Sequence, residues 1–366
     1  MSLRPCNSKR VWPRHREGGA ALVVALLVFA LSAALLVGLQ REFTLQMQRG
    51  TNTFLAEQGW AYLLGAEALG IVALRLDAQA DAQGETPQDR LSEVWASEAT
   101  PYPLAEGGWL LGHLEDLQGR FNLNALVSGD EGGDGVQDDA EDPSATVPPR
   151  ESGALRGEAR YTWHQRQFVR LLGTLDGVRV EREQAITLME GIADFLDSDD
   201  QRRFRGAEAE AYRNAQPPYQ TANRPLASVS ELRAVQGMTP EIYAALSPLV
   251  TVWPASGAPI NVLTAPAPVL RSLGPSDGFE PLSPADGERL VLAREQGIIR
   301  SVATLLEDIA FTGGDSGDLE AALVERSDWF LLSAAVEIAD REMRLYSVLQ
   351  REGESVRPRY RSRGEL

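Results

Sequence analysis

Cysteine and histidine are scarce in this sequence. Its 366 residues include one cysteine, Cys6, and three histidines, His15, His113 and His164. A single cysteine excludes an intramolecular disulfide and a multi-cysteine metal site. The histidines are widely separated along the chain, so a histidine-based metal centre would need carboxylates from distant positions to complete it. The composition therefore weighs against several classes of enzyme.

Basic residues are outnumbered by acidic ones. The 35 Lys and Arg residues stand against 52 Asp and Glu residues, which gives a formal net charge of −17. A nucleic-acid backbone is therefore an unfavourable main partner, because binding phosphates requires positive charge. With 43% hydrophobic and 24% charged residues, the chain can fold and is long enough for two or three domains.

The amino terminus has a basic segment followed by a long apolar run. Residues 1–19 carry five Lys or Arg side chains and one acid, and the run Ala20–Leu39 has no charge. At about 1.5 Å per residue the run covers about 30 Å, the thickness of a bilayer's hydrocarbon core. Basic residues before it predict a cytoplasmic amino terminus and a body outside the cytoplasm. A signal peptide cut near Ala30-Leu31-Ser32 is the alternative, but the apolar run continues well beyond that site.

The helical pattern continues past the apolar run. No proline lies between Ala20 and Pro87, and apolar residues keep helical spacing at Phe43, Met47, Phe54, Ala61, Leu64, Ala68 and Ile71. We therefore predict one continuous helix to about Asp77. Two interpretations stay open: a membrane anchor with a helical stalk, or a helix that packs beside copies or relatives in a bundle or fibre.

The start of the chain resembles the amino terminus of type IV pilins and pseudopilins. A short basic leader ends in glycine, and Ala-Ala-Leu-Val-Val begins the apolar helix at Ala20. In that family a prepilin peptidase cuts after the glycine and methylates the new amino terminus, which implies processing between Gly19 and Ala20. Most members have glutamate at the fifth mature position, where this chain has Val24. One branch lacks it: the K-type minor pseudopilin of the type II secretion system (general secretion pathway protein K).

Motifs farther along the chain are similar to the same K-type family. They are DLQGRFNLNAL from Asp116, GAE at Gly206–Glu208, YQTANRP from Tyr219, SVSELRAVQGM from Ser228 and INVLTA from Ile260. The resemblance covers nearly the whole chain, from Gly19 to about Leu349.

Strand patterns flank a helical region in the body of the chain. Trp109–Asp116 and Arg120–Ala125 predict two paired strands, and Ser327–Ile338 and Arg341–Arg351 predict two closing strands. Between them, helices are predicted at Gln165–Leu175, Arg182–Leu196, Ser228–Met238, Pro268–Leu273, Ala285–Gln296 and Ser301–Ile309. The fold class is therefore α+β: a long N-terminal transmembrane and stalk helix packs on a small antiparallel, type IV pilin-like sheet, with a large inserted all-α domain.

The predicted division of the chain follows from these patterns and the resemblance. The segments are a prepilin leader (1–19), the transmembrane part of the helix (20–39), its periplasmic part (40–77), a pilin-type linker with the first strands (78–126), an acidic flexible insertion (127–159), the inserted helical domain (160–252), returning helices and closing strands (253–352), and a basic disordered tail (353–366).

The first of two acidic runs partly fits an EF-hand calcium loop. Asp130, Asp134, Asp138 and Glu141 match positions 1, 5, 9 and 12 of that loop. However, position 3 is a glycine and Pro143 opposes an exit helix. A candidate Ca²⁺ site and a solvated insertion therefore both stay open.

The second acidic run follows a predicted helix. Asp194, Asp197, Asp199 and Asp200 lie at its carboxyl end, where the helix dipole disfavours negative charge. Either the following arginines (Arg202, Arg203 and Arg205) or a hard cation such as Ca²⁺ must compensate. K-type members carry an equivalent acidic run followed by Gly-Ala-Glu and can hold calcium, so the resemblance implies Glu208 as a further candidate ligand. The family often has aspartate next, where this chain has Ala209.

Two short motifs resemble those of other functional classes. SELRAVQGMTPEIYAAL and INVLTAPAPVLRSLG look like helix-hairpin-helix units, so a membrane-anchored nucleic-acid-binding protein of DNA uptake is the alternative function. That use needs glycine-rich hairpins with basic residues, which this acidic chain lacks. Gly314-Asp315-Ser316-Gly317 echoes the nucleophile loop of trypsin-like serine proteases, but Asp318 follows where those enzymes have glycine. We expect no catalytic residue and no nucleic-acid partner.

The resemblance implies a non-enzymatic minor pseudopilin that caps the tip of the pseudopilus. Such a protein is needed for pseudopilus assembly and for protein export across the outer membrane. This chain has Val24 where most members of the family have glutamate. The glutamate carboxylate is thought to contact the subunit above, so its loss fits a subunit at the tip. The implied partners are the I- and J-type minor pseudopilins, the major pseudopilin, prepilin peptidase, the inner membrane, and secreted substrates or the outer-membrane channel.

Overall fold

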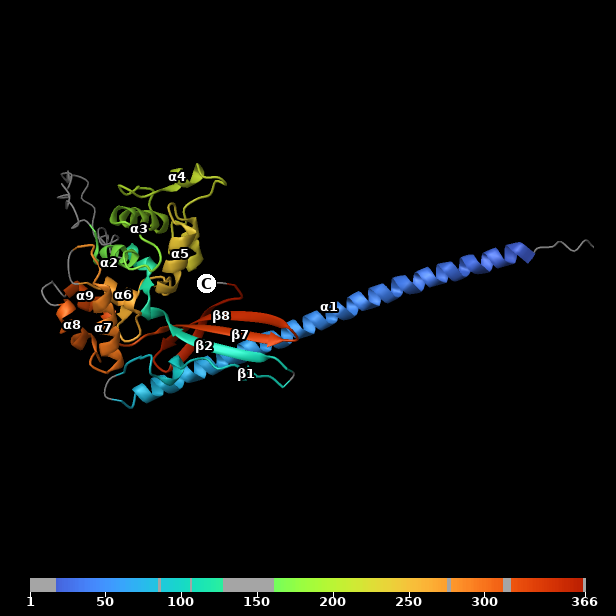
Figure 1. The fold of residues 1–366 in the computed structure, drawn as a ribbon, viewed down its shortest axis with the longest axis horizontal. Coiled ribbons are helices and arrows are strands. Elements are labelled where there is room, and N and C mark those ends of the chain that lie inside the picture. Colours follow the sequence, from blue (N-terminus) through green and yellow to red (C-terminus); the bar gives the residue numbers. More distant parts are fainter. Residues whose placement is uncertain are drawn as a thin grey trace, which may run out of the picture. The chain divides into compact units, whose positions relative to one another are not determined.

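The computed structural model describes residues 18–84, 87–105, 107–127, 161–274, 278–311 and 317–364. The chain divides into two compact units, residues 1–60 and 61–366. Each unit is described by itself, with the elements labelled in Figure 1.

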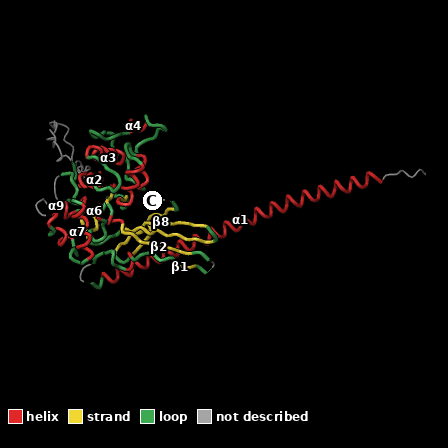
Figure 2. The backbone as a smooth tube through the Cα atoms, in the orientation of Figure 1, coloured by secondary structure: helices red, strands yellow, loops and turns green. Residues whose placement is uncertain are grey.

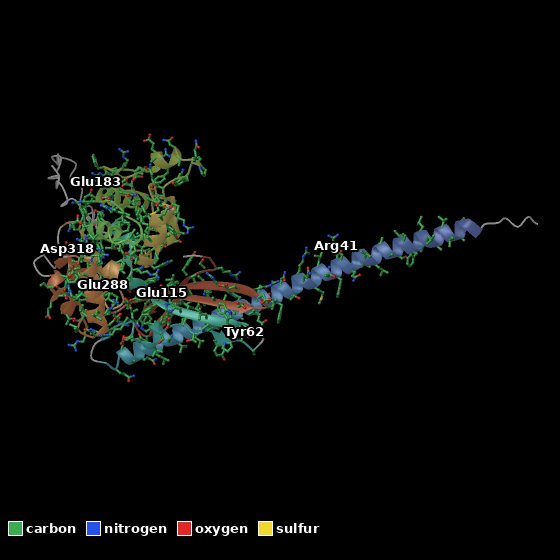
Figure 3. All side chains as sticks on the ribbon, viewed as in Figure 1. Arg41, Tyr62, Glu115, Glu183, Glu288 and Asp318 are labelled. Atoms are coloured by element: carbon green, nitrogen blue, oxygen red, sulfur yellow. The ribbon has the colours of Figure 1, made fainter. Side chains whose placement is uncertain are left out.

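The first unit consists, in its described part, of a single helix. Helix α1 runs without interruption from Gly18 to Asp81, a length of 64 residues, so its last 21 residues belong to the second unit. This confirms the continuous helix and extends it beyond Asp77. Among the described residues, α1 is the one helix long and apolar enough to cross a membrane. Its large apolar side chains from Leu22 to Leu39 are exposed, and so are those around Arg41 (Figure 3).

The second unit contains a five-stranded antiparallel sheet, coloured yellow in Figure 2. The strands lie in the order β1-β2-β7-β8-β9, with bounds Tyr102–Pro103, Trp109–Asp116, Trp329–Ile338, Arg341–Glu352 and Ser355–Ser362. The last turns of α1 lie along this sheet (Figure 1). Gly70 allows the close approach, since a Cβ there would lie 3.3 Å from a methyl group of Leu332. The pilin-like combination of helix and sheet is therefore confirmed.

The face of α1 that packs on the sheet is not the apolar stripe read from the sequence. Leu63, Ala66, Leu74 and Ala78 are buried together with Gly70. Residues of the predicted stripe, such as Ala61 and Ala68, are exposed. The helix therefore has apolar side chains both on the face against the sheet and on a face that nothing in the described chain covers.

The predicted strand Arg120–Ala125 is wrong. Strand β2 pairs instead with β7, so that Leu114 lies opposite Leu332. Only Phe121–Asn122 forms a strand, β3, which pairs in parallel with β4 (Val250–Thr251), and the chain then turns into the 3₁₀ helix η3, Leu123–Leu126. The alternation of polar and apolar residues gave a wrong prediction because its polar positions do not face solvent as they would in a strand. They are buried asparagines whose side chains bond to the backbone.

The basic segment near the carboxyl end is ordered, against the prediction of a disordered tail. Residues Ser355–Ser362 form β9, which pairs with β8 along the edge of the sheet. Charged side chains and a proline are typical of edge strands. Pro358 lies where the register shifts between Val348 and Leu349.

Helices make up most of the remainder, as predicted, and share one hydrophobic core that includes Phe121, Phe168, Met189 and Val262. The α-helices are α2 Trp163–Leu172, α3 Arg182–Leu196, α4 Ala209–Arg213, α5 Pro240–Leu246, α6 Ala267–Ser272, α7 Pro284–Glu295, α8 Val302–Leu306 and α9 Gly317–Ala321. The segment from Ser228 is shorter than predicted and forms a 3₁₀ helix, η5, Val229–Ala234. The remaining short elements are η1 Val94–Ala96, η2 Leu117–Gly119, η6 Ser247–Leu249, η7 Ile309–Phe311, and the paired strands β5 Ile260–Asn261 and β6 Leu323–Val324. The predicted boundaries of the inserted domain stay a prediction.

Candidate functional site

Three of the predicted calcium ligands converge between α3 and α4. Asp194 lies in the last turn of α3, Asp197 is the residue that ends this helix, and Glu208 precedes α4. One carboxylate oxygen from each lies within 4.8 Å of the others. Asp194 and Glu208 are buried, at 0% and 6% exposure, so the group forms part of the protein interior.

Arg203 supplies part of the compensating charge. Its Nη1 donates to Asp194 Oδ1 at 2.7 Å and also to Asp197 Oδ2, and its backbone N–H donates to Asp194. Arg205 instead pairs with Glu183. Thus, of the three predicted arginines, Arg203 is the one that pairs with the run in the described part of the chain, and it pairs with two of its carboxylates.

Glu208 is left without such compensation. Both of its carboxylate oxygens are buried and have no hydrogen-bond partner in the part of the chain that the structure describes. Burial, reinforced by the negative charges of Asp194 and Asp197, raises the pKa of Glu208 to about 7. Burial likewise raises the pKa of Asp197 to about 6, despite the opposing effect of Arg203. The site therefore carries more carboxylate than one arginine can balance, which is the condition a hard cation relieves.

The first residue of the Gly-Ala-Glu sequence, Gly206, packs directly against the acidic run. A Cβ at this position would overlap the Asp194 carboxylate. Glycine therefore lets the backbone pass directly against that side chain, which brings Glu208 to the cluster two residues later. A pocket of about 760 Å³, lined among others by Asp200, Arg202 and Glu208, lies next to the site.

The other predicted residues of this run lie outside the cluster of three. Asp199 and Asp200 are exposed, and Asp199 Oδ1 accepts a hydrogen bond of 2.6 Å from the backbone N–H of Gln201. Their role as ligands stays a prediction.

Several predicted positions fall outside the described residues. These are the first acidic run, with Asp130, Asp134, Asp138 and Glu141, and the serine of the protease-like motif, Ser316. Of the processing site, Gly19 and Ala20 both lie in the first turn of α1 and are exposed.

The motif GRFNLN joins the sheet to the helical region through buried amides. Asn124 Nδ2 donates to the carbonyls of Val252 at 2.8 Å and Leu226 at 3.2 Å, and its Oδ1 accepts from Leu226 N–H at 2.8 Å. Asn122 Nδ2 donates to the carbonyl of Pro254 at 2.8 Å. Because buried polar groups are costly unless paired, these asparagines fix where the two regions meet.

A second buried network connects this motif to INVLTA. Asp116 Oδ2 accepts hydrogen bonds from Asn261, Thr264 and Ser327. Burial raises the pKa of Asp116 to about 6, although these hydrogen bonds oppose the shift. Gly119 permits the contact, since a Cβ there would lie 2.9 Å from Thr264 Oγ1. The motifs DLQGRFNLNAL and INVLTA therefore pack against each other through this buried network.

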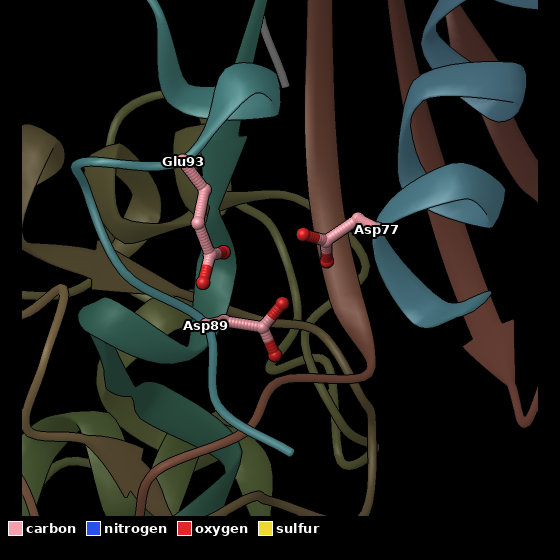
Figure 4. Close-up of side chains that lie close together, drawn as sticks. All are labelled: Asp77, Asp89 and Glu93. Atoms are coloured by element: carbon pink, nitrogen blue, oxygen red, sulfur yellow. The ribbon is translucent and has the colours of Figure 1, made fainter. Parts of the chain in front are cut away.

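Sequence reasoning missed a second group of carboxylates. Asp77, Asp89 and Glu93 come together beside the buried Arg351, as Figure 4 shows for the three acids. Each is a single acid in an unremarkable polar stretch, and the arginine that pairs with Asp77 and Asp89 follows more than 250 residues later. No local sequence signal could have revealed this group.

The chain is similar to known proteins of the type II secretion system. The chain matches models of type II secretion system protein K over residues 119–255 and 260–326. Type II secretion system protein K of Pseudomonas aeruginosa is 33% identical over 92% of this chain and 90% of its own length. The chain belongs to the type II secretion system protein K family. The protein K of Klebsiella pneumoniae is 30% identical over 93% of this chain and 94% of that protein.

A solved structure supports the fold of this protein K family member. The crystal structure of the GspK-GspI-GspJ complex from enterotoxigenic Escherichia coli matches with a TM-score of 0.63 and 23% identity, over 87% of this chain and 100% of the matched chain. The protein is thus a minor pseudopilin of the type II secretion system. This family is a structural component of secretion rather than an enzyme family. In the described part of this chain, α1 is the one helix apolar enough to cross a membrane, which is compatible with anchoring in the inner membrane.

Proposed function

We propose that this minor pseudopilin caps the tip of the type II secretion pseudopilus and is needed for pseudopilus assembly and protein export across the outer membrane. The observation that carries the proposal is an exposed apolar face on α1, formed by Gly65, Ala68, Leu69, Val72 and Leu76. Leu69 and Leu76 are 68% and 61% exposed. The opposite face of the same helix packs on the sheet.

An apolar stripe with small residues suits a partner helix. Small side chains let a second helix approach closely, and the leucines supply apolar area to bury. The solved relative is a complex with GspI and GspJ. By analogy, the I- and J-type minor pseudopilins are the partners that cover this face, and the major pseudopilin lies next in the fibre.

Membrane insertion and processing complete the proposal. Ala20–Leu39 spans the inner membrane, with the amino terminus in the cytoplasm and the body in the periplasm. Prepilin peptidase cuts between Gly19 and Ala20. Val24, in place of the usual glutamate, suits a subunit that has nothing above it, and from the tip the protein meets secreted substrates or the outer-membrane channel.

Calcium is the proposed ligand of the first carboxylate cluster. Asp194, Asp197 and Glu208 would hold the ion, with Asp199 and Asp200 as further candidate ligands. An oxygen separation within 4.8 Å suits Ca²⁺, whose ligand distances are about 2.3–2.6 Å. The bound ion would supply the missing positive charge and fix the connection between α3 and α4. The acidic run with Asp130, Asp134, Asp138 and Glu141 remains a second candidate Ca²⁺ loop.

Copurification tests the assembly proposal. Leu69→Glu combined with Leu76→Glu places charge on the exposed face, so the full-length chain should no longer copurify in detergent with its I- and J-type partners. Leu292→Glu is the matched control, because Leu292 is likewise an exposed leucine but lies on α7 rather than on α1. It should keep the complex. Retention of both partners by the double variant, with an unchanged melting temperature, would refute this interface.

A further inference from the structure

The acidic group that the sequence did not reveal joins three parts of the second unit. Asp77 lies one turn before the end of α1, Asp89 in the segment that follows, and Glu93 just before η1. One carboxylate oxygen of each lies within 4.8 Å of the others. Figure 4 shows the three side chains converging on the same space from different directions.

A single arginine balances only part of this charge. Arg351 of β8 is completely buried; its Nη1 donates to Asp77 Oδ2 at 2.9 Å and its Nη2 donates to Asp89 Oδ2. The same Nη2 also donates to the carbonyl of Ser327 at 2.5 Å. Three carboxylates therefore face one guanidinium, and such an excess of buried negative charge is unfavourable without a further positive charge.

Asp89 and Glu93 are each held in place by hydrogen bonds to one carboxylate oxygen, which leaves the other oxygen available to a ligand. Asp89 is 0% exposed, and its Oδ2 accepts from Arg351 and from the backbone N–H of Ser327 at 2.6 Å. Its Oδ1 is buried and has no hydrogen-bond partner among the described residues. Glu93 is fixed through Oε2, which accepts from Trp95 Nε1 at 2.6 Å and from Arg90 N–H at 3.1 Å. An unsatisfied buried oxygen on a carboxylate that lies beside two others points to a missing ligand.

We propose that Asp77, Asp89 and Glu93 bind a hard divalent cation, Ca²⁺, through oxygens that Arg351 does not occupy. Oxygens within 4.8 Å of one another can share one Ca²⁺ ion at ligand distances of about 2.3–2.6 Å, whereas Mg²⁺ requires a tighter octahedron and gives up its water reluctantly. Arg351 remains as the counter-charge for Asp77 and Asp89. This site shares no residue with the Asp194 cluster.

The electrostatics of the group support this assignment. Burial raises the pKa of Asp77 to about 7, and the charges of Glu93 and Asp89 add to this shift. Burial also raises the pKa of Glu93. A bound cation would remove this penalty and would tie the segment around Asp89 to α1 and to β8. Trp95 lies against Phe330 of the sheet with ring centroids 5.2 Å apart, so the ion would also hold this part of the core.

Terbium luminescence gives a readout specific to this site. Tb³⁺ replaces Ca²⁺ at oxygen sites, and its emission is sensitised by an adjacent indole. Trp95 bonds directly to the candidate ligand Glu93 without being a ligand itself. The experiment uses the full-length, chelator-treated chain in detergent with Glu208→Gln, which removes a ligand of the other cluster. We expect tryptophan-sensitised Tb³⁺ emission that Ca²⁺ displaces and that Trp95→Phe abolishes.

Variants of the charged residues complete the test. Glu93→Gln should weaken Ca²⁺ binding at least about tenfold and remove the rise in melting temperature that Ca²⁺ causes in the Glu208→Gln chain. Asp328→Asn is the matched control, since Asp328 is an exposed carboxylate adjacent to the Arg351 backbone; it should leave both unchanged. If Glu93→Gln does not fold, the Trp95→Phe comparison alone decides, because that variant keeps all three ligands. Emission that does not depend on Trp95 would overturn the proposal and leave the carboxylates to share protons beside Arg351.

Discussion

Arg361 of β9 forms two hydrogen bonds of 2.7 Å with the carboxylate of Glu67 on α1, across 294 residues of sequence. Glu67 is buried, at 4% exposure, and also accepts a bond of 2.6 Å from Ser347 Oγ. The last strand of the sheet is thereby fastened to the N-terminal helix. This pair explains why a basic segment near the carboxyl end is ordered.

Removing Arg361 should destabilise the second unit. Arg361→Ala leaves the Glu67 carboxylate buried with Ser347 as its one remaining hydrogen-bond partner among the described residues. We expect a loss of about 2 kcal/mol in the free energy of unfolding. Arg359→Ala is the control, because Arg359 pairs with Glu352 at the surface and such pairs contribute about 0–1 kcal/mol. Urea denaturation of the detergent-solubilised chains measures both. Equal losses in the two variants would contradict the role given to Glu67.

The same pair predicts a dependence on pH. Burial raises the pKa of Glu67, but hydrogen bonds from Arg361 and Ser347 and the charge of Arg361 outweigh it, so the pKa lies below its ordinary value of 4.5. A lowered folded-state pKa means that the stabilisation is present above about 4.5 and is lost as the pH falls further. The difference in unfolding free energy between the wild-type chain and Glu67→Gln should therefore shrink below that pH. A difference that stays constant down to pH about 3 would rule this out.

The spacing of apolar and polar residues within each helix or strand predicted most of the fold. Helical spacing located α3 at its observed bounds, Arg182–Leu196, and continuous strand patterns located β7 and β8 to within two residues. The pairing of strands was harder. The sequence pattern predicts that Trp109–Asp116 pairs with its neighbour along the chain. It pairs instead with β7, more than 200 residues later, because only the folded chain decides which edges meet.

The candidate site was predicted in part for a similar reason. Asp194, Asp197 and Glu208 lie within 15 residues of one another, so the acidic run could indicate them. Spacing could not separate Asp197 from Asp199, because which side chain faces inward depends on where α3 ends. Asp77 and Arg351 show the limit more clearly: their contact exists only through the packing of α1 on the sheet.

Processing of the amino terminus can be tested directly. Gly19→Arg places a long charged side chain at the predicted cut, so the variant should keep residues 1–19 when it is produced together with prepilin peptidase. Intact-mass analysis of the wild-type chain should find a mature protein that begins with methylated Ala20. Gly38→Ala is the control, since an added Cβ at Gly38 meets no atom within 4 Å; it should be processed normally. An uncut wild-type chain in the presence of active peptidase would remove the basis for its assembly into a fibre.

Gly206 should be required for calcium binding at the first carboxylate cluster. In Gly206→Ala the new Cβ overlaps the Asp194 carboxylate, so the backbone must move and carry Glu208 away from Asp194 and Asp197. We expect a destabilisation of about 1–3 kcal/mol and the loss of that part of the Ca²⁺-induced rise in melting temperature which Glu208→Gln also removes. Gly191→Ala serves as the control within α3, where the nearest atom to an added Cβ lies 3.8 Å away and alanine favours the helix by up to about 1 kcal/mol. If Gly206→Ala binds Ca²⁺ as tightly as Gly191→Ala does, the ion is not held by Glu208 together with the aspartates of α3.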